Sequence, residues 1–133
     1  MANETRPHVL VVDDYPEMAT KIGDVVERAG FRASCAFGGR EGLAVFDRAL
    51  SAGAPFSAVV TDFRMADLDG LAVAAAVKAA SPATAVVLLT ASTIDSKDEL
   101  PLNVDAVLEK PLSGTQLPST LARLLVDPDA ARQ

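Results

Sequence analysis

The sequence predicts an α/β fold in which a five-stranded parallel sheet carries helices on both faces. Five short apolar runs of strand length alternate along the chain with segments whose apolar residues recur at helical spacing. The first run, at 8–13, is apolar on both of its faces, which is typical of a parallel strand covered on both sides. Because crossovers between parallel strands are right-handed, this alternation leaves few topologies.

Length and composition limit the classes of function. A chain of 133 residues, half of them hydrophobic, suits one compact domain with one core. Its formal net charge of -6 and the absence of a basic cluster argue against direct nucleic-acid binding. No stretch approaches the roughly 20 apolar residues of a membrane span, so we expect no membrane contact and a cytoplasmic location.

The first half of the chain is expected to contain two strands and two helices. Pro16 suits the first turn of a helix that follows the first strand, and Gly30 ends that helix. The second strand, at 31–37, is interrupted by an arginine and a serine, which places it nearer an edge of the sheet. Two consecutive glycines then turn the chain into the second helix.

The second half is expected to add three strands and further helices. The strands lie at 56–62, 84–90 and 104–110, and an alanine-rich helix at about 71–80 separates the first two of them. The last helix carries four leucines at helical spacing, namely Leu117, Leu121, Leu124 and Leu125. The domain is therefore expected to span 8–126, between a flexible N-terminus at 1–7 and a polar tail at 127–133.

The segment 91–103 is the weakest part of this pattern. It is polar, contains Pro101 and offers little apolar face. A helix belongs between the last two strands, so this fourth helix must be short or irregular.

Polar residues follow four of the five strands at the points where those strands end. Asp13 and Asp14 follow the first strand, Asp62 ends the third, Thr90 ends the fourth and Lys110 ends the fifth. The carboxyl ends of parallel strands meet at one edge of a sheet, where ligands bind. Three carboxylates without a nearby His or Cys favour Mg²⁺ or Mn²⁺, and one of them could act as a nucleophile toward a phosphoryl group.

The stretches VVDD, VVTDFRMADLDG, LLTAS and LEKP, in this order, resemble the receiver domain of two-component response regulators. The resemblance spans nearly the whole chain and implies a flavodoxin-like, doubly wound sheet with strand order 2-1-3-4-5. It implies that Asp62 accepts a phosphoryl group from a sensor histidine kinase or a histidine phosphotransfer protein. It also implies that Mg²⁺ is held by Asp13, Asp14, Asp62 and the backbone carbonyl of Arg64.

The resemblance assigns further roles at the same edge. Thr90 and Lys110 would contact the bound phosphoryl group, a cis peptide bond would precede Pro111, and the small Ala91 would leave room for the donor. The chain would not be an enzyme beyond its own phosphorylation and dephosphorylation. It would act on an unknown downstream protein as a monomer or weak homodimer, either alone or as a domain excised from a longer protein.

The chain departs from the family pattern at three places. Ala66 stands where the family usually has proline, so the loop after the third strand is expected to be less rigid. Val107 stands where receivers often carry the Tyr or Phe of the switch, and 91–103 is unlike the usual fourth helix. These departures keep a second interpretation open, a pseudo-receiver interaction module or a phosphate sink with little conformational switching.

Other interpretations fit the residues less well. A haloacid-dehalogenase-like hydrolase needs Asp-x-Asp after the first strand, where this chain has an adjacent pair. A flavin binder needs phosphate-binding donors there, and two carboxylates would repel a phosphate. Locally, Asp14 could instead cap a helix, Asp67 is interpreted as a solvated turn residue, and Asp69 as a cap for the helix that follows.

Overall fold

The computed structural model describes residues 6–91, 100–112 and 114–126 of the chain. Five strands form one parallel sheet in the order β2-β1-β3-β4-β5, which confirms the predicted fold class and places the second strand at an edge. The strands are β1 (His8–Val12), β2 (Arg32–Ala36), β3 (Ala58–Asp62), β4 (Ala85–Thr90) and β5 (Ala106–Glu109).

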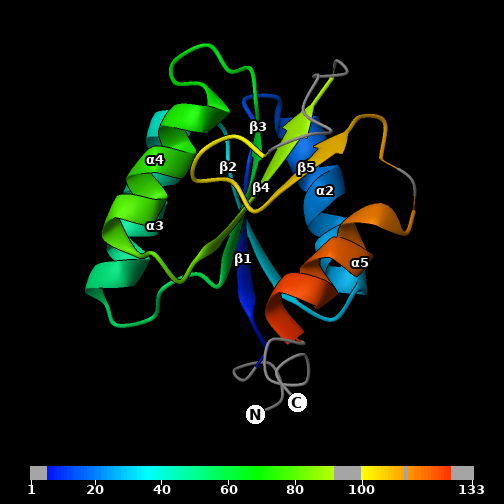
Figure 1. Ribbon diagram of the computed structural model, residues 1–133, viewed down its shortest axis with the longest axis horizontal. Coiled ribbons are helices and arrows are strands. Elements are labelled where there is room, and N and C mark those ends of the chain that lie inside the picture. The colour runs from blue at the N-terminus through cyan, green and yellow to red at the C-terminus, as the bar shows by residue number, and fades with distance from the viewer. Residues whose placement is uncertain (1–5, 92–99, 113, 127–133) are drawn as a thin grey trace.

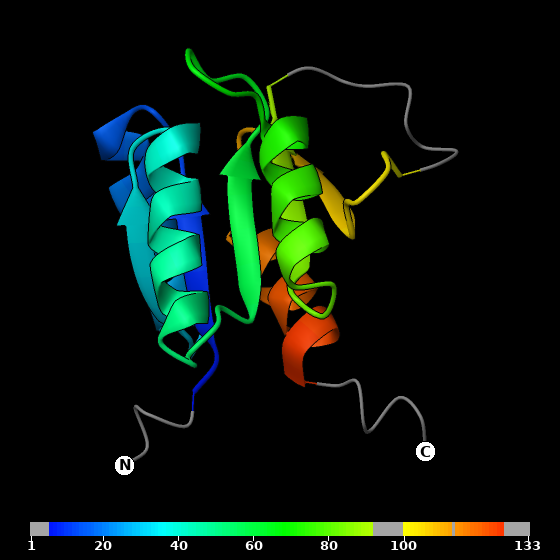
Figure 2. The same ribbon diagram turned by 90° about the vertical axis from the view of Figure 1, so that its left-hand side faces the viewer.

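Helices cover both faces of the sheet. One face carries α2 (Pro16–Arg28) and α5 (Gln116–Leu121), and the opposite face carries α3 (Gly39–Ser51) and α4 (Gly70–Ala80) (Figure 1). The view turned by 90° shows α3 and α4 lying side by side across the front of the sheet (Figure 2). The predicted last helix differs in its second half, because α5 ends at Leu121 and continues as a π-helical turn, η1 (Ala122–Val126).

The sheet separates the core into two layers, and alternate residues of each central strand point into opposite layers. In β1, Val9 and Val11 face α2 and α5, whereas Leu10 and Val12 face α3 and α4. β3 and β4 alternate in the same way, and nearly all of these side chains are withdrawn from solvent. Successive residues of a strand point to opposite faces, so strands covered on both sides must be apolar throughout, as the sequence indicates.

Each strand is one to three residues shorter than the apolar run that predicts it. Phe56 and Val104, for example, are 3% and 6% exposed and belong to the core, yet they precede β3 and β5. Burial thus extends beyond the backbone hydrogen bonds that define a strand, so an apolar run overestimates strand length.

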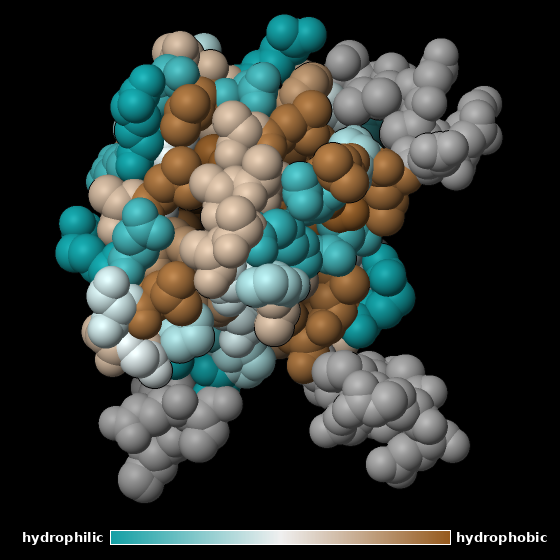
Figure 3. Space-filling model, turned by 60° about the vertical axis from the view of Figure 1, so that its left-hand side comes forward, coloured by the Kyte–Doolittle hydropathy of each residue, from teal (hydrophilic) through white to brown (hydrophobic). Residues whose placement is uncertain are grey.

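Helix α4 begins as the sequence indicates. The Asp69 carboxylate accepts a hydrogen bond from the backbone N–H of Ala72 at 2.9 Å, which confirms the predicted cap. Buried Val73, Ala74 and Val77 face the sheet, while most of the exposed positions are alanines. Figure 3 shows the result, a pale band of weakly hydrophobic surface across this face. Alanine favours the helical state most strongly of all residues, so α4 does not depend on surface ion pairs.

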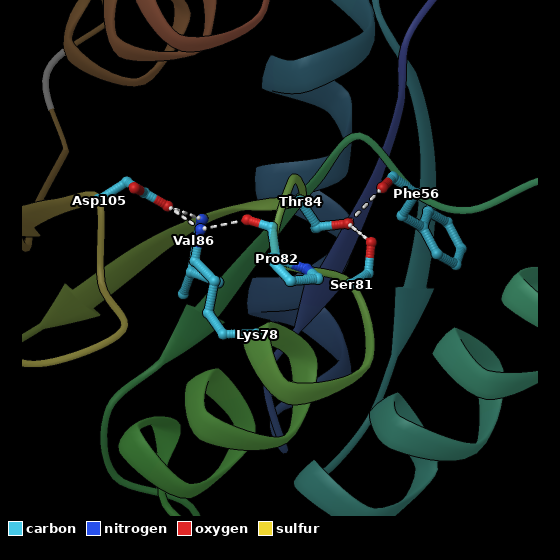
Figure 4. A network of polar contacts seen from close by, with 7 residues as sticks. All are labelled: Phe56, Lys78, Ser81, Pro82, Thr84, Val86 and Asp105. Carbon is cyan, nitrogen blue, oxygen red and sulfur yellow. Dashed lines mark hydrogen bonds and ion pairs between the residues drawn. The ribbon is translucent and has the colours of Figure 1, made fainter.

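A polar network joins the amino-terminal ends of β4 and β5 to the carboxyl-terminal end of α4 (Figure 4). The Asp105 carboxylate accepts a hydrogen bond from the backbone N–H of Val86 at 2.8 Å and pairs with the Lys78 ammonium at 2.9 Å. The backbone N–H of Asp105 donates in turn to the Val86 carbonyl at 2.8 Å. Asp105 therefore extends the hydrogen bonding between β4 and β5 by one residue before the start of β5.

Three predicted features lie wholly or partly outside the described residues. Residues 1–5 and 127–133 belong to the predicted N-terminus and tail, and 92–99 contain most of the predicted fourth helix. Of the helices that the structure describes, none combines the length and the apolar character needed to cross a bilayer.

Candidate functional site

The register of the sheet brings the predicted site residues to one edge. Val12 pairs with Thr61 across β1 and β3, so Asp13 lies beside Asp62. Thr90 pairs with Glu109 across β4 and β5, which places Lys110 one residue further along the same edge. This convergence follows from parallel pairing, which aligns the carboxyl ends of all the strands.

Three carboxylates meet at this edge. Asp13, Asp14 and Asp62 each offer one oxygen, and these three oxygens lie within 4.8 Å of one another. Asp13 is fully buried, Asp62 is 7% exposed and Asp14 is half-buried. A buried cluster of three like charges is unfavourable unless a cation compensates it.

Each carboxylate has one oxygen held by a backbone N–H. Tyr15 donates to Asp13 Oδ1 at 2.9 Å, Ala66 donates to Asp14 Oδ2 at 2.9 Å, and Phe63 donates to Asp62 Oδ1 at 3.1 Å. In the described part of the chain, Asp13 Oδ2 and Asp14 Oδ1 are buried and accept no hydrogen bond. Buried polar atoms usually have partners, so these two oxygens are available to bind a cation.

Lys110 supplies the positive charge of the cluster. Its ammonium lies 2.9 Å from Asp62 Oδ1 and 3.7 Å from Asp13 Oδ2. The peptide bond between Lys110 and Pro111 is cis, the form that the resemblance implies. One ammonium cannot neutralise three carboxylates, so the cluster keeps a net negative charge when all four groups are ionised.

The pKa of Asp13 reflects this imbalance. Burial is the largest cause that raises the pKa of its carboxyl above the ordinary value, and the charges of Asp62 and Asp14 raise it further. The hydrogen bond from Tyr15 and the charge of Lys110 oppose the rise without cancelling it. Ionised Asp13 therefore lacks sufficient stabilisation from the protein alone, and a divalent cation would supply it.

The donor set fits a hard divalent cation. All three side chains are oxygen ligands, and one oxygen of each lies close enough to the other two to share one ion, as Mg²⁺ and Mn²⁺ require. The backbone carbonyl of Arg64, the fourth expected ligand, stays a prediction.

A cavity of about 280 Å³ opens beside Asp62. Its walls include Thr90, Ala91 and Lys110, and the Thr90 side chain is only 2% exposed. The Arg64 guanidinium lies 5.4 Å from the centre of the Phe63 ring, and both residues line the same cavity. Thr90 and Lys110 thus flank the space next to the expected acceptor, while Ala91 leaves part of it open.

Gly70 allows the loop after β3 to return close to the backbone of Asp62. Its backbone N–H donates to the Phe63 carbonyl at 2.7 Å. A Cβ atom on Gly70 would collide with the backbone carbonyl oxygen of Asp62 and would lie 2.6 Å from a methyl group of Leu88. Only glycine fits this close approach, so the loop sequence helps to position Asp62.

Asp67 is an exposed residue of the loop, as interpreted, but it also has a structural role that the sequence did not indicate. Although exposed, its carboxylate accepts hydrogen bonds from the backbone N–H groups of Gly39 and Arg40, both at 3.0 Å, and from Leu68 at 2.8 Å. These bonds lower the pKa of Asp67, the one from Arg40 most strongly. The free N–H groups at a helix start attract a carboxylate, and here the carboxylate comes from a loop 28 residues away.

Val107 is not among the residues that line the cavity beside Asp62. It is half-buried and packs against the core layer of α3 and α4. Its place as the switch position therefore stays a prediction.

Sequence reasoning missed an apolar groove of about 580 Å³ next to the site. It is lined by Met18, Lys21, Ile22, Val25, Leu89, Ala91, Lys110, Pro111 and Leu112. The available signal was Met18, an exposed apolar residue on the first turn of the helix that follows Asp13 and Asp14.

The chain is similar to known signalling proteins. A family model described as the response regulator receiver domain matches residues 9–122. The Salmonella typhimurium protein "Transcriptional regulatory protein ZraR" is 32% identical over 120 residues, which cover 88% of this chain and 26% of that protein. The chain therefore spans about a quarter of the length of this curated relative.

Solved structures agree with this similarity. The Vibrio cholerae chemotaxis protein CheY4 is 26% identical with a TM-score of 0.76, over 91% of this chain and all of that one. The Thermotoga maritima response regulator TrrA, solved with Mg²⁺ and beryllofluoride, is 24% identical with a TM-score of 0.77, over 90% of this chain and 99% of that one. The second likeness shows the fold alone.

Proposed function

Because this chain belongs to the response regulator receiver domain family, we propose that it accepts a phosphoryl group on Asp62 and thereby changes its affinity for a partner protein. The observation that carries the proposal is the cluster of Asp13, Asp14 and Asp62 with Lys110 at 2.9 Å from the acceptor carboxylate. The phosphodonor would be a phosphohistidine of a sensor histidine kinase or a histidine phosphotransfer protein.

The contacts of Asp62 support the choice of nucleophile. Both Phe63 and Lys110 contact Oδ1, so we assign Oδ2 as the attacking oxygen. In the transfer, the phosphorus–nitrogen bond of the donor breaks, a phosphorus–oxygen bond to Asp62 forms, and the released imidazole takes up a proton. Lys110 would then pair with one phosphoryl oxygen, and the Thr90 hydroxyl would donate to another.

The cation belongs to the same proposal. Asp13, Asp14 and Asp62 would hold Mg²⁺ or Mn²⁺ together with the Arg64 backbone carbonyl, through the oxygens that face one another. When bound, the ion neutralises charge on the transferring phosphoryl group. The protein's own contribution is to hold the carboxylates with backbone N–H groups and to keep Lys110 beside the acceptor.

The apolar groove suits the phosphodonor domain. It borders Ala91 and Lys110, which also line the cavity at Asp62, so a protein that covers the groove would lie next to the acceptor. Lys21 and Lys110 add positive charge to an otherwise apolar lining, which favours a donor that carries a phosphoryl group.

Phosphorylation tests the central claim. Incubation with acetyl phosphate and Mg²⁺ should add the mass of one phosphoryl group to the intact protein, and Asp62→Ala should abolish the addition. The control is Asp47→Ala, which removes an exposed carboxylate of α3. Absence of the adduct on the wild-type chain, or full labelling of Asp62→Ala, would refute the proposal.

A phosphate sink with little conformational output is the second candidate. Val107 favours it, because a half-buried valine packed on the core cannot swing as an aromatic ring would. In neither case do we expect turnover of an external substrate. The downstream protein, the monomeric or weakly dimeric state and the cytoplasmic location belong to the same proposal.

A further inference from the structure

In each of the three carboxylates of the site, a backbone N–H binds one oxygen, but the donor to Asp14 is remote in the sequence. The N–H groups that hold Asp13 and Asp62 come from Tyr15 and Phe63, two residues and one residue away along the chain. The N–H that holds Asp14 comes from Ala66, 52 residues away in the loop between β3 and α4. The orientation of Asp14 therefore depends on how that loop folds against the end of β1.

We propose that the backbone N–H of Ala66 is a positioning group for the cation site. It binds Asp14 Oδ2 at 2.9 Å, which leaves Oδ1, buried and without a hydrogen bond in the described part of the chain, as the oxygen available to a cation. The inference rests on the proposed function, since it concerns the same cation site. It extends that function by naming a group that sets cation affinity without touching the cation.

The next residue fixes the position of this amide. The Asp67 carboxylate binds the first two backbone N–H groups of α3, at Gly39 and Arg40. Leu68 also packs closely on Gly39, where an added Cβ would lie 2.7 Å from the Leu68 Cβ. Asp67 thus attaches the loop to α3, and the neighbouring Ala66 attaches it to Asp14. These bonds restrain the position of the Ala66 N–H relative to the Asp14 carboxylate.

In this chain the hydrogen bond to Asp14 uses the backbone N–H at position 66 and nothing of the side chain. The Ala66 side chain is exposed, and every residue except proline has a backbone N–H. Proline at 66 would remove the donor and leave Asp14 Oδ2 without its partner. The sequence alone associates alanine at this position with a less rigid loop. In the structure, the Ala66 N–H instead supplies a hydrogen bond between the loop and Asp14.

Cation binding to three versions of the whole chain tests the inference. Isothermal titration calorimetry with MgCl₂ should show binding to the wild type and nearly the same affinity for Ala66→Ser, which keeps the N–H. Ala66→Pro should bind about tenfold more weakly, the loss expected from one net hydrogen bond. Equal affinities of Ala66→Pro and Ala66→Ser would overturn the inference and leave the proposed function intact. No binding by the wild type would overturn the proposed cation site itself, and the inference with it.

A second measurement does not use the proline variant, so it tests the inference even when Ala66→Pro fails to fold. Amide hydrogen exchange, followed by NMR without added cation, should show the Ala66 N–H protected in the wild type and exchanging several-fold faster in Asp14→Ala. The N–H groups of Gly39 and Arg40, held by Asp67, should exchange equally in both proteins. An Ala66 N–H that exchanges at the same rate in both would overturn the inference.

Discussion

At the scale of single residues, Asp13 illustrates the conflict between stability and function. It is completely buried, and burial together with two neighbouring carboxylates raises its pKa. Its ionised form therefore costs folding free energy until a cation binds. A residue that served only the fold would not carry this charge.

Asp13→Asn should therefore stabilise the cation-free protein at neutral pH. The substitution removes a buried charge but keeps an oxygen to accept the Tyr15 N–H, so the thermal midpoint should rise by about 2–4 °C, or about 1 kcal/mol. Mg²⁺ should raise the midpoint of the wild type and leave that of Asp13→Asn unchanged. The control is Asp24→Asn, at an exposed aspartate of α2. A cation-free midpoint below that of the wild type would contradict this explanation.

At the scale of elements, the pairing of β4 with β5 depends on a side chain. β5 is the shortest strand, with four residues, and its pairing with β4 begins at Val87 and Ala106. One residue earlier, the Asp105 carboxylate takes the Val86 N–H in place of a backbone carbonyl. Lys78 joins α4 to this carboxylate and also reaches the Pro82 carbonyl (Figure 4).

Asp105→Ala should cost more stability than Lys78→Met. The first substitution leaves the Val86 N–H without its acceptor, at about 1–2 kcal/mol, whereas the second removes a partly exposed ion pair worth about 0–1 kcal/mol. Urea denaturation measures both free energies of unfolding. Asp105→Asn, which keeps an acceptor, should lie close to Lys78→Met. If Lys78→Met were as costly as Asp105→Ala, the ion pair would be the dominant interaction.

At the scale of the whole molecule, the phosphoryl signal that we propose at Asp62 would have to reach a surface that a partner contacts. Lys110 is the direct route among the described residues, because it contacts Asp62 and leads through Pro111 toward α5. Buried Leu117 and Leu121 fix α5 to the core layer that it shares with α2. Phosphorylation that draws Lys110 away from Asp62 Oδ1 would thus act on the segment before α5.

Beryllofluoride with Mg²⁺, which mimics the aspartyl phosphate, should therefore change the amide chemical shifts of α5 as well as those around Asp62. Two-dimensional NMR of the wild-type chain measures both sets, and Asp62→Ala serves as the control that should show neither. Changes confined to the residues around Asp62 would favour the phosphate sink over the switch.

Much of the fold could be predicted because its signals are local. Apolar strands and helix-period segments alternate, and this pattern reflects burial on both faces of the sheet. The predicted ends of the strands were less accurate, because residues such as Phe56 are buried without taking part in the backbone pairing of the sheet. The contacts of Asp67 with the start of α3 were missed for a related reason, since these partners lie 27 and 28 residues away.

The sequence by itself determined which groups gather at the site. Five residues lie at the ends of strands or directly after them, and parallel pairing must bring those ends to one edge: Asp13, Asp14, Asp62, Thr90 and Lys110. Only the tertiary structure decided which oxygen of each carboxylate is held by the backbone, because that depends on the placement of the N–H groups. For Asp14 the N–H belongs to Ala66, and no local pattern relates two residues that meet only after the sheet has formed.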